Sequence, residues 1–72
     1  MIKPGIWKHS KSGKEYRLIE VGKHTESMEN LVLYEALYKN ETSQLWARPV
    51  PMWEGEMEIE GKKVPRFVFV RE

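Results

Sequence analysis

The chain has 72 residues, no cysteine, and a formal net charge of +1 from 12 basic and 11 acidic side chains. A chain this short makes one domain, here residues 1–72, and hides only about 60% of the surface that it exposes when unfolded. Without cysteine it has neither a disulfide nor a thiolate metal site, so apolar packing or a partner surface must stabilise the fold. The small net charge argues against a dedicated nucleic-acid-binding protein, which usually shows a stronger basic excess.

The sequence carries no signal for a membrane or for export. No apolar run approaches the roughly 18 residues of a membrane span. The first ten residues, "MIKPGIWKHS", lack the apolar segment of a signal peptide. Three Trp, three Tyr and two Phe are too many for a disordered chain of this length. We therefore expect a folded, soluble, cytoplasmic protein that makes no membrane contact.

The first two predicted elements form a hairpin. "GIWKH" at 5–9 and "EYRLIEVGKH" at 15–24 are rich in strand formers, and the turn between them contains Gly13. Within the second strand the apolar phase slips, because Leu18 and Ile19 fall on opposite faces. A β-bulge near 18–20 would bring both halves of the strand onto one core.

The segment "KHTESMENLVLYEALYK", residues 23–39, is ambiguous. Thr25 or Ser27 with the good helix formers that follow would suit a helix over 26–38. "LVLYEALY" at 31–38 would instead suit a central strand that is apolar on both faces, preceded by a polar loop over 24–30. Periodicity alone does not decide. The strand is favoured because its absence would leave two hydrophobic sheet edges exposed.

The C-terminal half predicts further strands. "SQLWARPV" should be a strand that stops at Pro49, which lacks an amide donor, and a tight turn near 50–54 should bring Trp53 back onto the sheet. "EMEIEGKKVPRFVFV" at 56–70 alternates clearly and predicts a hairpin. The predicted fold is all-β: an SH3-like barrel or roll of five or six bent antiparallel strands with a one-turn helix near 50–54. The alternative is α+β, with helix 26–38.

The order of several short motifs resembles a known bacterial family. The motifs are Gly5, Trp7, His9, Gly13, Tyr16, then "KHTESMENLVLYEALY", "LWARPVPMW" and "VPRFVF". Together they resemble the family catalogued as domain of unknown function 1653, over nearly the whole chain. The resemblance implies no activity. It places the family's Val-Val-Tyr on Val32, Leu33 and Tyr34, which favours the strand reading because β-branched residues prefer strands.

A catalytic site is not expected, and no cofactor is predicted. Ser10 follows His9 directly, so in a strand the two side chains would point apart. His24, Glu26 and Glu29 are suitable metal ligands, and the alternative function is a metal or small-ligand site in their loop. Three ligands from one short loop seldom converge, however. Loop residues such as Thr25 and Ser27 could equally bond the loop's own backbone.

Two arginines stand out, because Arg48 and Arg66 each lie beside a proline and near aromatic residues. A guanidinium held next to a ring can bind a carboxylate or phosphate. Each arginine could instead stack on a ring and pair with a glutamate. The predicted function is a non-catalytic binding module that recognises a peptide, a protein or a nucleic acid through an aromatic groove with arginines on its rim. The predicted groove residues are Trp7, Tyr34, Trp46, Arg48, Trp53 and Arg66.

Overall fold

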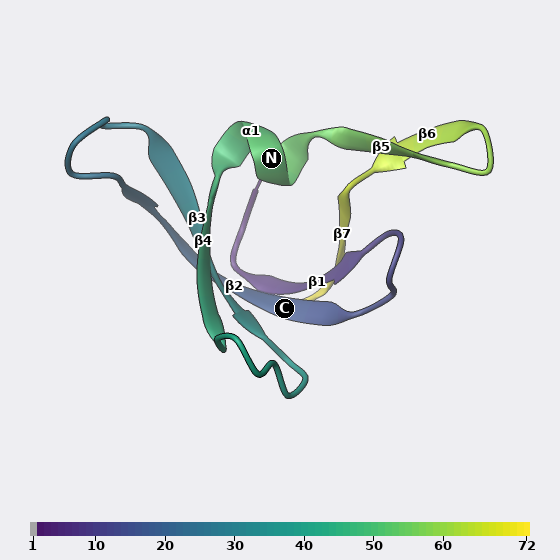
Figure 1. Ribbon diagram of the computed structural model, residues 1–72, viewed down its shortest axis with the longest axis horizontal. Coiled ribbons are helices and arrows are strands. Elements are labelled where there is room, and N and C mark those ends of the chain that lie inside the picture. Colours follow the sequence, from purple (N-terminus) through teal and green to yellow (C-terminus); the bar gives the residue numbers. More distant parts are fainter. Residues whose placement is uncertain (1) are drawn as a thin grey trace.

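The computed structural model describes residues 2–72 and contains seven strands and one short helix (Figure 1). The elements in chain order are β1 (Gly5–His9), β2 (Glu15–Lys23), β3 (Asn30–Ala36), β4 (Leu45–Pro49), α1 (Val50–Glu54), β5 (Glu56–Ile59), β6 (Lys62–Pro65) and β7 (Phe67–Arg71). The predicted all-β class and the one-turn helix at 50–54 are confirmed.

Five strands form one antiparallel sheet in the order β4-β3-β2-β1-β7, and β5 and β6 form a separate hairpin. The sheet curves around α1, and the β5–β6 hairpin projects to one side (Figure 1). It does not close into a barrel, since β4 and β7 lie at its two ends without a mutual ladder. The outer side of β4 is therefore an open edge.

The ambiguous segment is a loop followed by a strand, so the alternative helix over 26–38 is wrong. β3 pairs with β2 on one side and with β4 on the other. Val32 and Tyr34 are buried while Leu33 between them is exposed, which is the period-2 alternation of a strand. The preceding loop is closed by a hydrogen bond from the amide of His24 to the carbonyl of Glu29.

The predicted bulge in β2 is present, where the register with β3 shifts between Leu18 and Glu20. Leu18 pairs with Tyr34 and Val21 pairs with Val32, so the shift places Leu18 and Val21 on the same face. Ile19 is 44% exposed and remains outside the core. Val21 is also 37% exposed, so the bulge turns Val21 to the face of Leu18 without burying it in the core.

The C-terminal pairing differs from the prediction and explains the extra strand. β5 pairs with β6, whereas β7 pairs with β1. Arg66 separates β6 from β7, because its amide bonds the carbonyl of Gly55 and its carbonyl accepts the amide of Ser10. These two bonds turn the chain from the hairpin into the main sheet.

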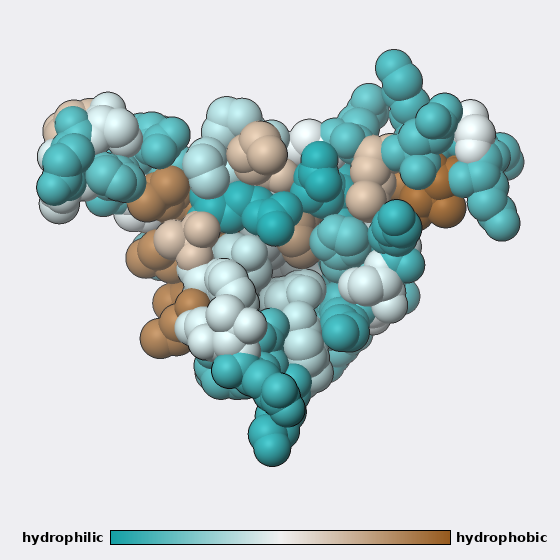
Figure 2. Space-filling model, viewed as in Figure 1, coloured by the Kyte–Doolittle hydropathy of each residue, from teal (hydrophilic) through white to brown (hydrophobic). Residues whose placement is uncertain are grey.

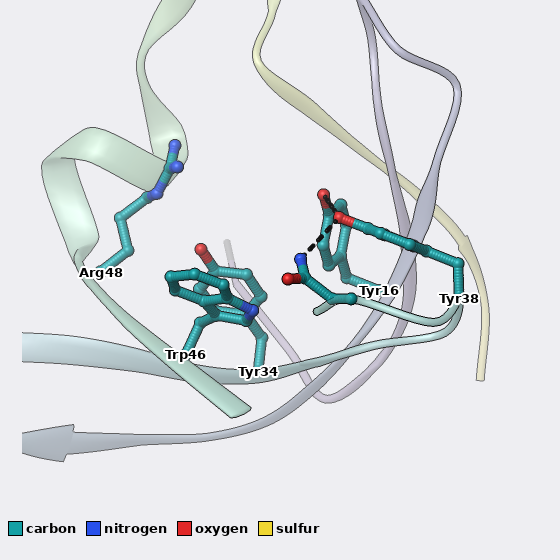
Figure 3. Close-up of a pocket in the computed structure, with 6 residues that line it drawn as sticks. Tyr16, Tyr34, Tyr38, Trp46 and Arg48 are labelled. Carbon is teal, nitrogen blue, oxygen red and sulfur yellow. Dashed lines mark hydrogen bonds between the residues drawn. The ribbon is translucent and has the colours of Figure 1, made fainter. Parts of the chain in front are cut away.

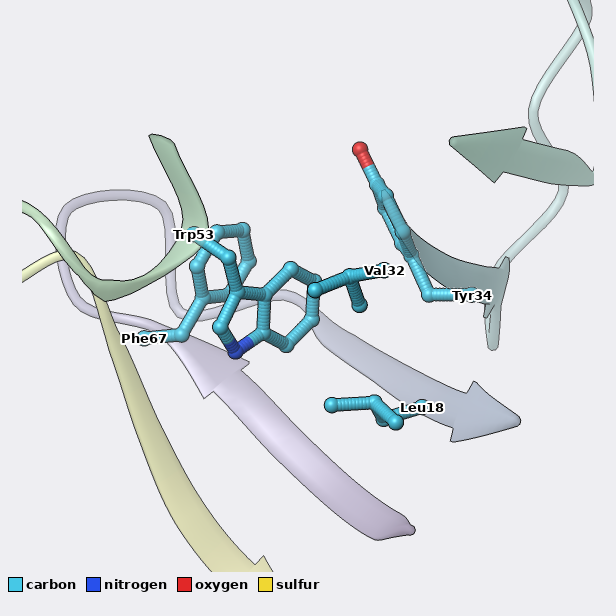
Figure 4. Packing of buried hydrophobic residues seen from close by; sticks show 5 residues of the cluster. All are labelled: Leu18, Val32, Tyr34, Trp53 and Phe67. Carbon is cyan, nitrogen blue, oxygen red and sulfur yellow. The ribbon is translucent and has the colours of Figure 1, made fainter. Parts of the chain in front are cut away.

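The core lies between the inner face of the sheet and α1 (Figure 4). Leu18, Val32, Tyr34, Trp53 and Phe67 form it, and Trp53 is only 1% exposed. The indole of Trp53 stacks on the Phe67 ring at 3.8 Å between centroids and 4° between planes. Since α1 follows Pro49 directly, the end of β4 determines where this tryptophan enters the core.

The molecule is wider than a compact sphere because its hairpins project. Its Cα radius of gyration is 12.4 Å, against about 11 Å for a compact chain of this length. Hydrophobic residues gather along the flank where β3 and β4 lie (Figure 2). No helix within residues 2–72 is long and apolar enough to cross a membrane.

Candidate aromatic and arginine site

An open pocket of about 200 Å³ lies on the inner face of the sheet, at its β4 end (Figure 3). We call it the aromatic pocket. Three tyrosines, one tryptophan, an asparagine and an arginine line it: Tyr16, Tyr34, Tyr38, Asn40, Trp46 and Arg48. Three of these residues, Tyr34, Trp46 and Arg48, belong to the groove predicted from the sequence.

Strand pairing brings those three residues together. Tyr34 on β3 lies opposite Trp46 on β4, and Val32 lies opposite Arg48. Residues directly opposite one another share a face, so Trp46 and Arg48 join Tyr34 and Val32 on the inner face. The Trp46 indole donates to the carbonyl of Ser43 at 2.9 Å, which fixes the ring.

Tyr38 supplies the polar side of the aromatic pocket. Its hydroxyl oxygen lies 2.9 Å from that of Tyr16 and accepts the side-chain amide of Asn40 at 3.2 Å (Figure 3). The Tyr16 hydrogen bond lowers the pKa of Tyr38, and burial together with this bond raises the pKa of Tyr16. Either hydroxyl can be the donor in the bond between Tyr16 and Tyr38.

Arg48 lies near the aromatic ring of Phe67 and has no acidic side chain beside it in residues 2–72. Its Cζ lies 5.5 Å from the centroid of Phe67. Among residues 2–72, neither Arg48 nor Arg66 has a carboxylate within 4.0 Å, and the buried Nε of Arg66 has no hydrogen-bond partner. The expected stacking is thus present for Arg48, and the expected glutamate partner is present for neither arginine.

The other predicted groove residues lie elsewhere. Trp7 and Trp53 line a second pocket of about 190 Å³ together with Ile2, Glu54 and Phe67. Trp53 belongs mainly to the core, where its Nε1 is buried without a partner in residues 2–72. The structure thus divides five of the six predicted groove residues between two pockets, and Arg66 lines neither of them.

Sequence reasoning missed Tyr16, Tyr38 and Asn40. Alternation with the buried Leu18 could have placed Tyr16 on the inner face. Nothing in the sequence marks Asn40, which lies in the loop after β3. Its Oδ1 accepts the amides of Thr42 and Ser43, and these bonds shape the loop that carries it.

His9 lies close to the arginines. Its ring meets Phe67 edge-on at 5.1 Å, and its Nδ1 accepts the amides of Lys11 and Ser12 at 3.3 Å. Partial burial lowers the pKa of His9, and the charges of Arg48, Arg66 and Lys11 lower it further. The neighbourhood of Phe67 is therefore rich in positive charge.

Replacing Arg48 by Gln should raise the pKa of His9 toward its ordinary value of about 6.5, because one of the nearby positive charges disappears. A lowered pKa means that the folded protein prefers neutral imidazole. Stability is then complete above about pH 6.5 and falls as the pH drops through the folded-state pKa. The Arg48→Gln variant should therefore lose less folding stability than the unsubstituted protein as the pH drops below about 6.5. NMR titration of the imidazole measures the shift, and an unchanged His9 pKa would contradict the proximity of Arg48.

Hydrogen bonds within the loop of His24 stabilise its conformation, and most of the donors are backbone amides. The Nδ1 atom of His24 accepts the amides of Glu26 and Ser27 at 3.1 and 3.2 Å. Glu29 contributes its carbonyl and its amide, the latter bonded to Ser27 Oγ. Within the described residues 2–72, no group of three or more His, Cys, Asp or Glu side chains is arranged to hold a metal.

Comparison with known proteins identifies the family. The family described as protein of unknown function, DUF1653, matches residues 5–69. The chain belongs to the DUF1653 family. A crystal structure of a DUF1653 protein from Bordetella bronchiseptica is similar, with a TM-score of 0.90 and 26% identity over 97% of this chain and 88% of that one. A search of curated proteins gives no match. Membership of the DUF1653 family, expected from the order of the motifs, is confirmed. The family description names no ligand.

Proposed function

We propose that this protein is a non-catalytic binding module that recognises an acidic segment of a partner protein in the aromatic pocket. One observation carries the proposal: Arg48 is a partly buried residue that borders a ring-lined pocket, and its guanidinium has no carboxylate within 4.0 Å in residues 2–72. A partly buried cation is best stabilised by an anion with which it forms charge-assisted hydrogen bonds. A carboxylate from a partner would fill that role.

The polar groups that face the pocket favour an anion. Arg48 offers only donors, and Asn40 and the hydroxyls of Tyr16 and Tyr38 add polar groups that can donate to an anion. The rings of Tyr34 and Trp46 supply apolar contact for the stem of the incoming side chain. A volume of about 200 Å³ suits one side chain better than a whole small-molecule ligand.

A peptide is favoured over a nucleic acid because the chain exposes several acidic side chains. Glu54, at the end of α1, and Glu56, Glu58 and Glu60, in the hairpin that follows it, are exposed. Exposed carboxylates repel an extended polyanion more than they repel a single carboxylate. The net charge of +1 is also small for a protein that binds phosphate backbones.

The proposal includes an SH3-like mode of action in the cytoplasm. Small bent sheets with aromatic residues on one face commonly present peptide-binding surfaces. The absence of cysteine fits a reducing compartment.

Selection from a random-peptide display library tests the proposal. Enriched peptides should contain Asp or Glu, and Arg48→Gln should weaken their binding about tenfold or more, since hydrogen bonds to charged groups contribute roughly 1.5–3 kcal/mol. Arg71→Gln is the matched control, because Arg71 lies on the opposite edge strand and is 61% exposed. A single-stranded oligonucleotide forms the second arm. Tight oligonucleotide binding, or peptides that ignore Arg48, would refute the proposal.

A further inference from the structure

We propose that the acidic segment binds as an added strand along the outer edge of β4, with an apolar residue next to its acidic one. This inference rests on the proposed function and names the form and pattern of the ligand. It is carried by three features of β4: an unpaired edge, a pocket on each face, and a cation on one face only.

The hydrogen-bond alternation shows which backbone groups of β4 face outward. Ala36 and Gln44 form a hydrogen-bonded pair, through the amide of Ala36 and the carbonyl of Gln44 at 2.8 Å. Bonded and non-bonded pairs alternate along an antiparallel ladder, so Trp46 and Arg48 bond toward β3. The amide and carbonyl of Leu45 and Ala47 therefore point away from the sheet.

Of these outward groups, those of Ala47 are the best placed for a ligand. The hydroxyl of Ser43 already donates to the carbonyl of Leu45 at 2.7 Å. Pro49 has no amide proton and closes the edge at its other end. Both backbone groups of Ala47 remain, and Ala47 is exposed. An incoming strand would centre on this residue.

Each face of β4 has its own depression. The aromatic pocket lies on the inner face beside Trp46 and Arg48. A groove of about 380 Å³, which we call the outer apolar groove, is lined by the exposed Ile19, Leu33, Leu45 and Ala47, and it also touches Tyr34 and Trp46 of the inner face. Leu33 and Leu45 are 38% and 64% exposed. This groove contributes to the hydrophobic flank visible over β3 and β4 (Figure 2).

In an added strand, neighbouring side chains would enter the two depressions on opposite faces of β4. Side chains of successive residues point to opposite faces. The residue opposite Ala47 would enter the outer apolar groove, and the residue opposite Arg48 would turn to the inner face and meet the guanidinium. The sites therefore select an acidic residue adjacent to an apolar one. Backbone bonds to the edge would supply affinity, and the two depressions specificity.

A second copy of the chain fits this edge less well. The β4 sequence "LWARP" contains no acidic residue, so pairing two β4 strands would leave Arg48 without a carboxylate from the added strand. The unpaired cation favours a partner segment that carries its own acid.

Three changes test the strand-addition mode, using peptides from the display selection. Methylating the peptide's backbone amides at the positions that face β4 should weaken binding tenfold or more, while methylation at the alternate amides should not. Ala47→Pro should have a similar effect, and its fold should persist because that amide makes no bond inside the sheet. On binding, hydrogen exchange of the Ala47 amide should slow.

Leu45→Lys tests the outer apolar groove and should weaken binding tenfold or more. Met28→Lys is its control, since Met28 is 61% exposed and lies in the distant loop between β2 and β3. Peptides that need Arg48 but tolerate Ala47→Pro and both methylation patterns would overturn strand addition while leaving the proposed function intact. Peptides indifferent to Arg48 would overturn the proposed function itself. Sedimentation completes the test, because a dimer that Ala47→Pro dissociates would assign the edge to a second copy.

Discussion

Trp53→Ala is expected to lower the free energy of unfolding by about 3–5 kcal/mol, the usual cost of removing a buried large aromatic side chain. Trp53 is 1% exposed and stacks on Phe67 at 3.8 Å. It also meets Trp7 and Tyr34 edge-on, at 5.8 and 4.9 Å. In a domain of 72 residues one indole is a large part of the core. Urea unfolding followed by circular dichroism measures the loss.

Two variants give this prediction its controls. Trp53→Phe should cost less than Trp53→Ala, because it retains an aromatic ring and removes the buried Nε1 that has no partner in residues 2–72. Met52→Ala, the neighbouring substitution, should change stability by less than about 0.5 kcal/mol, because Met52 is 54% exposed. Equal losses at 52 and 53 would show that α1 does not anchor the core through its tryptophan.

Gly5→Ala should also be strongly destabilising, by about 2–4 kcal/mol from backbone strain and steric overlap together. Gly5 has φ +143°, a backbone conformation that residues with a side chain rarely adopt. An added Cβ would lie 2.8 Å from the carbonyl oxygen of Arg71 and 2.7 Å from Cε1 of Phe69. The first contact is with backbone, so a rotamer change cannot relieve it. Equilibrium urea unfolding measures the effect.

The control is Gly22→Ala on β2. Its φ is not in the positive range, and an added Cβ would meet only a Leu33 methyl group, at 3.6 Å. This substitution should be neutral or stabilise by about 0.4–1 kcal/mol, since it restricts the unfolded chain. If Gly5→Ala were as mild as Gly22→Ala, the close approach of β7 to the start of β1 would be refuted.

Local chemistry was sufficient to predict most elements. β4 ends at Pro49, the residue at which the sequence predicted that the strand would stop, and alternation identified β5. The phase slip at Leu18 predicted the bulge. These features depend on properties of neighbouring residues, so one stretch of sequence contains all the information needed.

Part of the candidate site was also predictable. Tyr34, Trp46 and Arg48 were selected for their residue types, and the structure places them around one pocket. They lie together because β3 pairs with β4, a pairing that the sequence analysis did not predict. Tyr38 and Asn40 reach the same pocket through a loop whose path is determined by its hydrogen bonds to Gln44 and Ser43.

The sequence by itself determined the all-β class, the central strand, predicted over 31–38 and observed as Asn30–Ala36, and the family suggested by the order of the motifs. Only the tertiary structure decided that β7 pairs with β1, that Trp53 is core rather than groove, and that neither Arg48 nor Arg66 has an acidic partner in residues 2–72. The physical reason is the distance along the chain over which each interaction acts. Strand propensity and turn chemistry act between adjacent residues, whereas burial and ion pairing depend on groups that lie far apart along the chain.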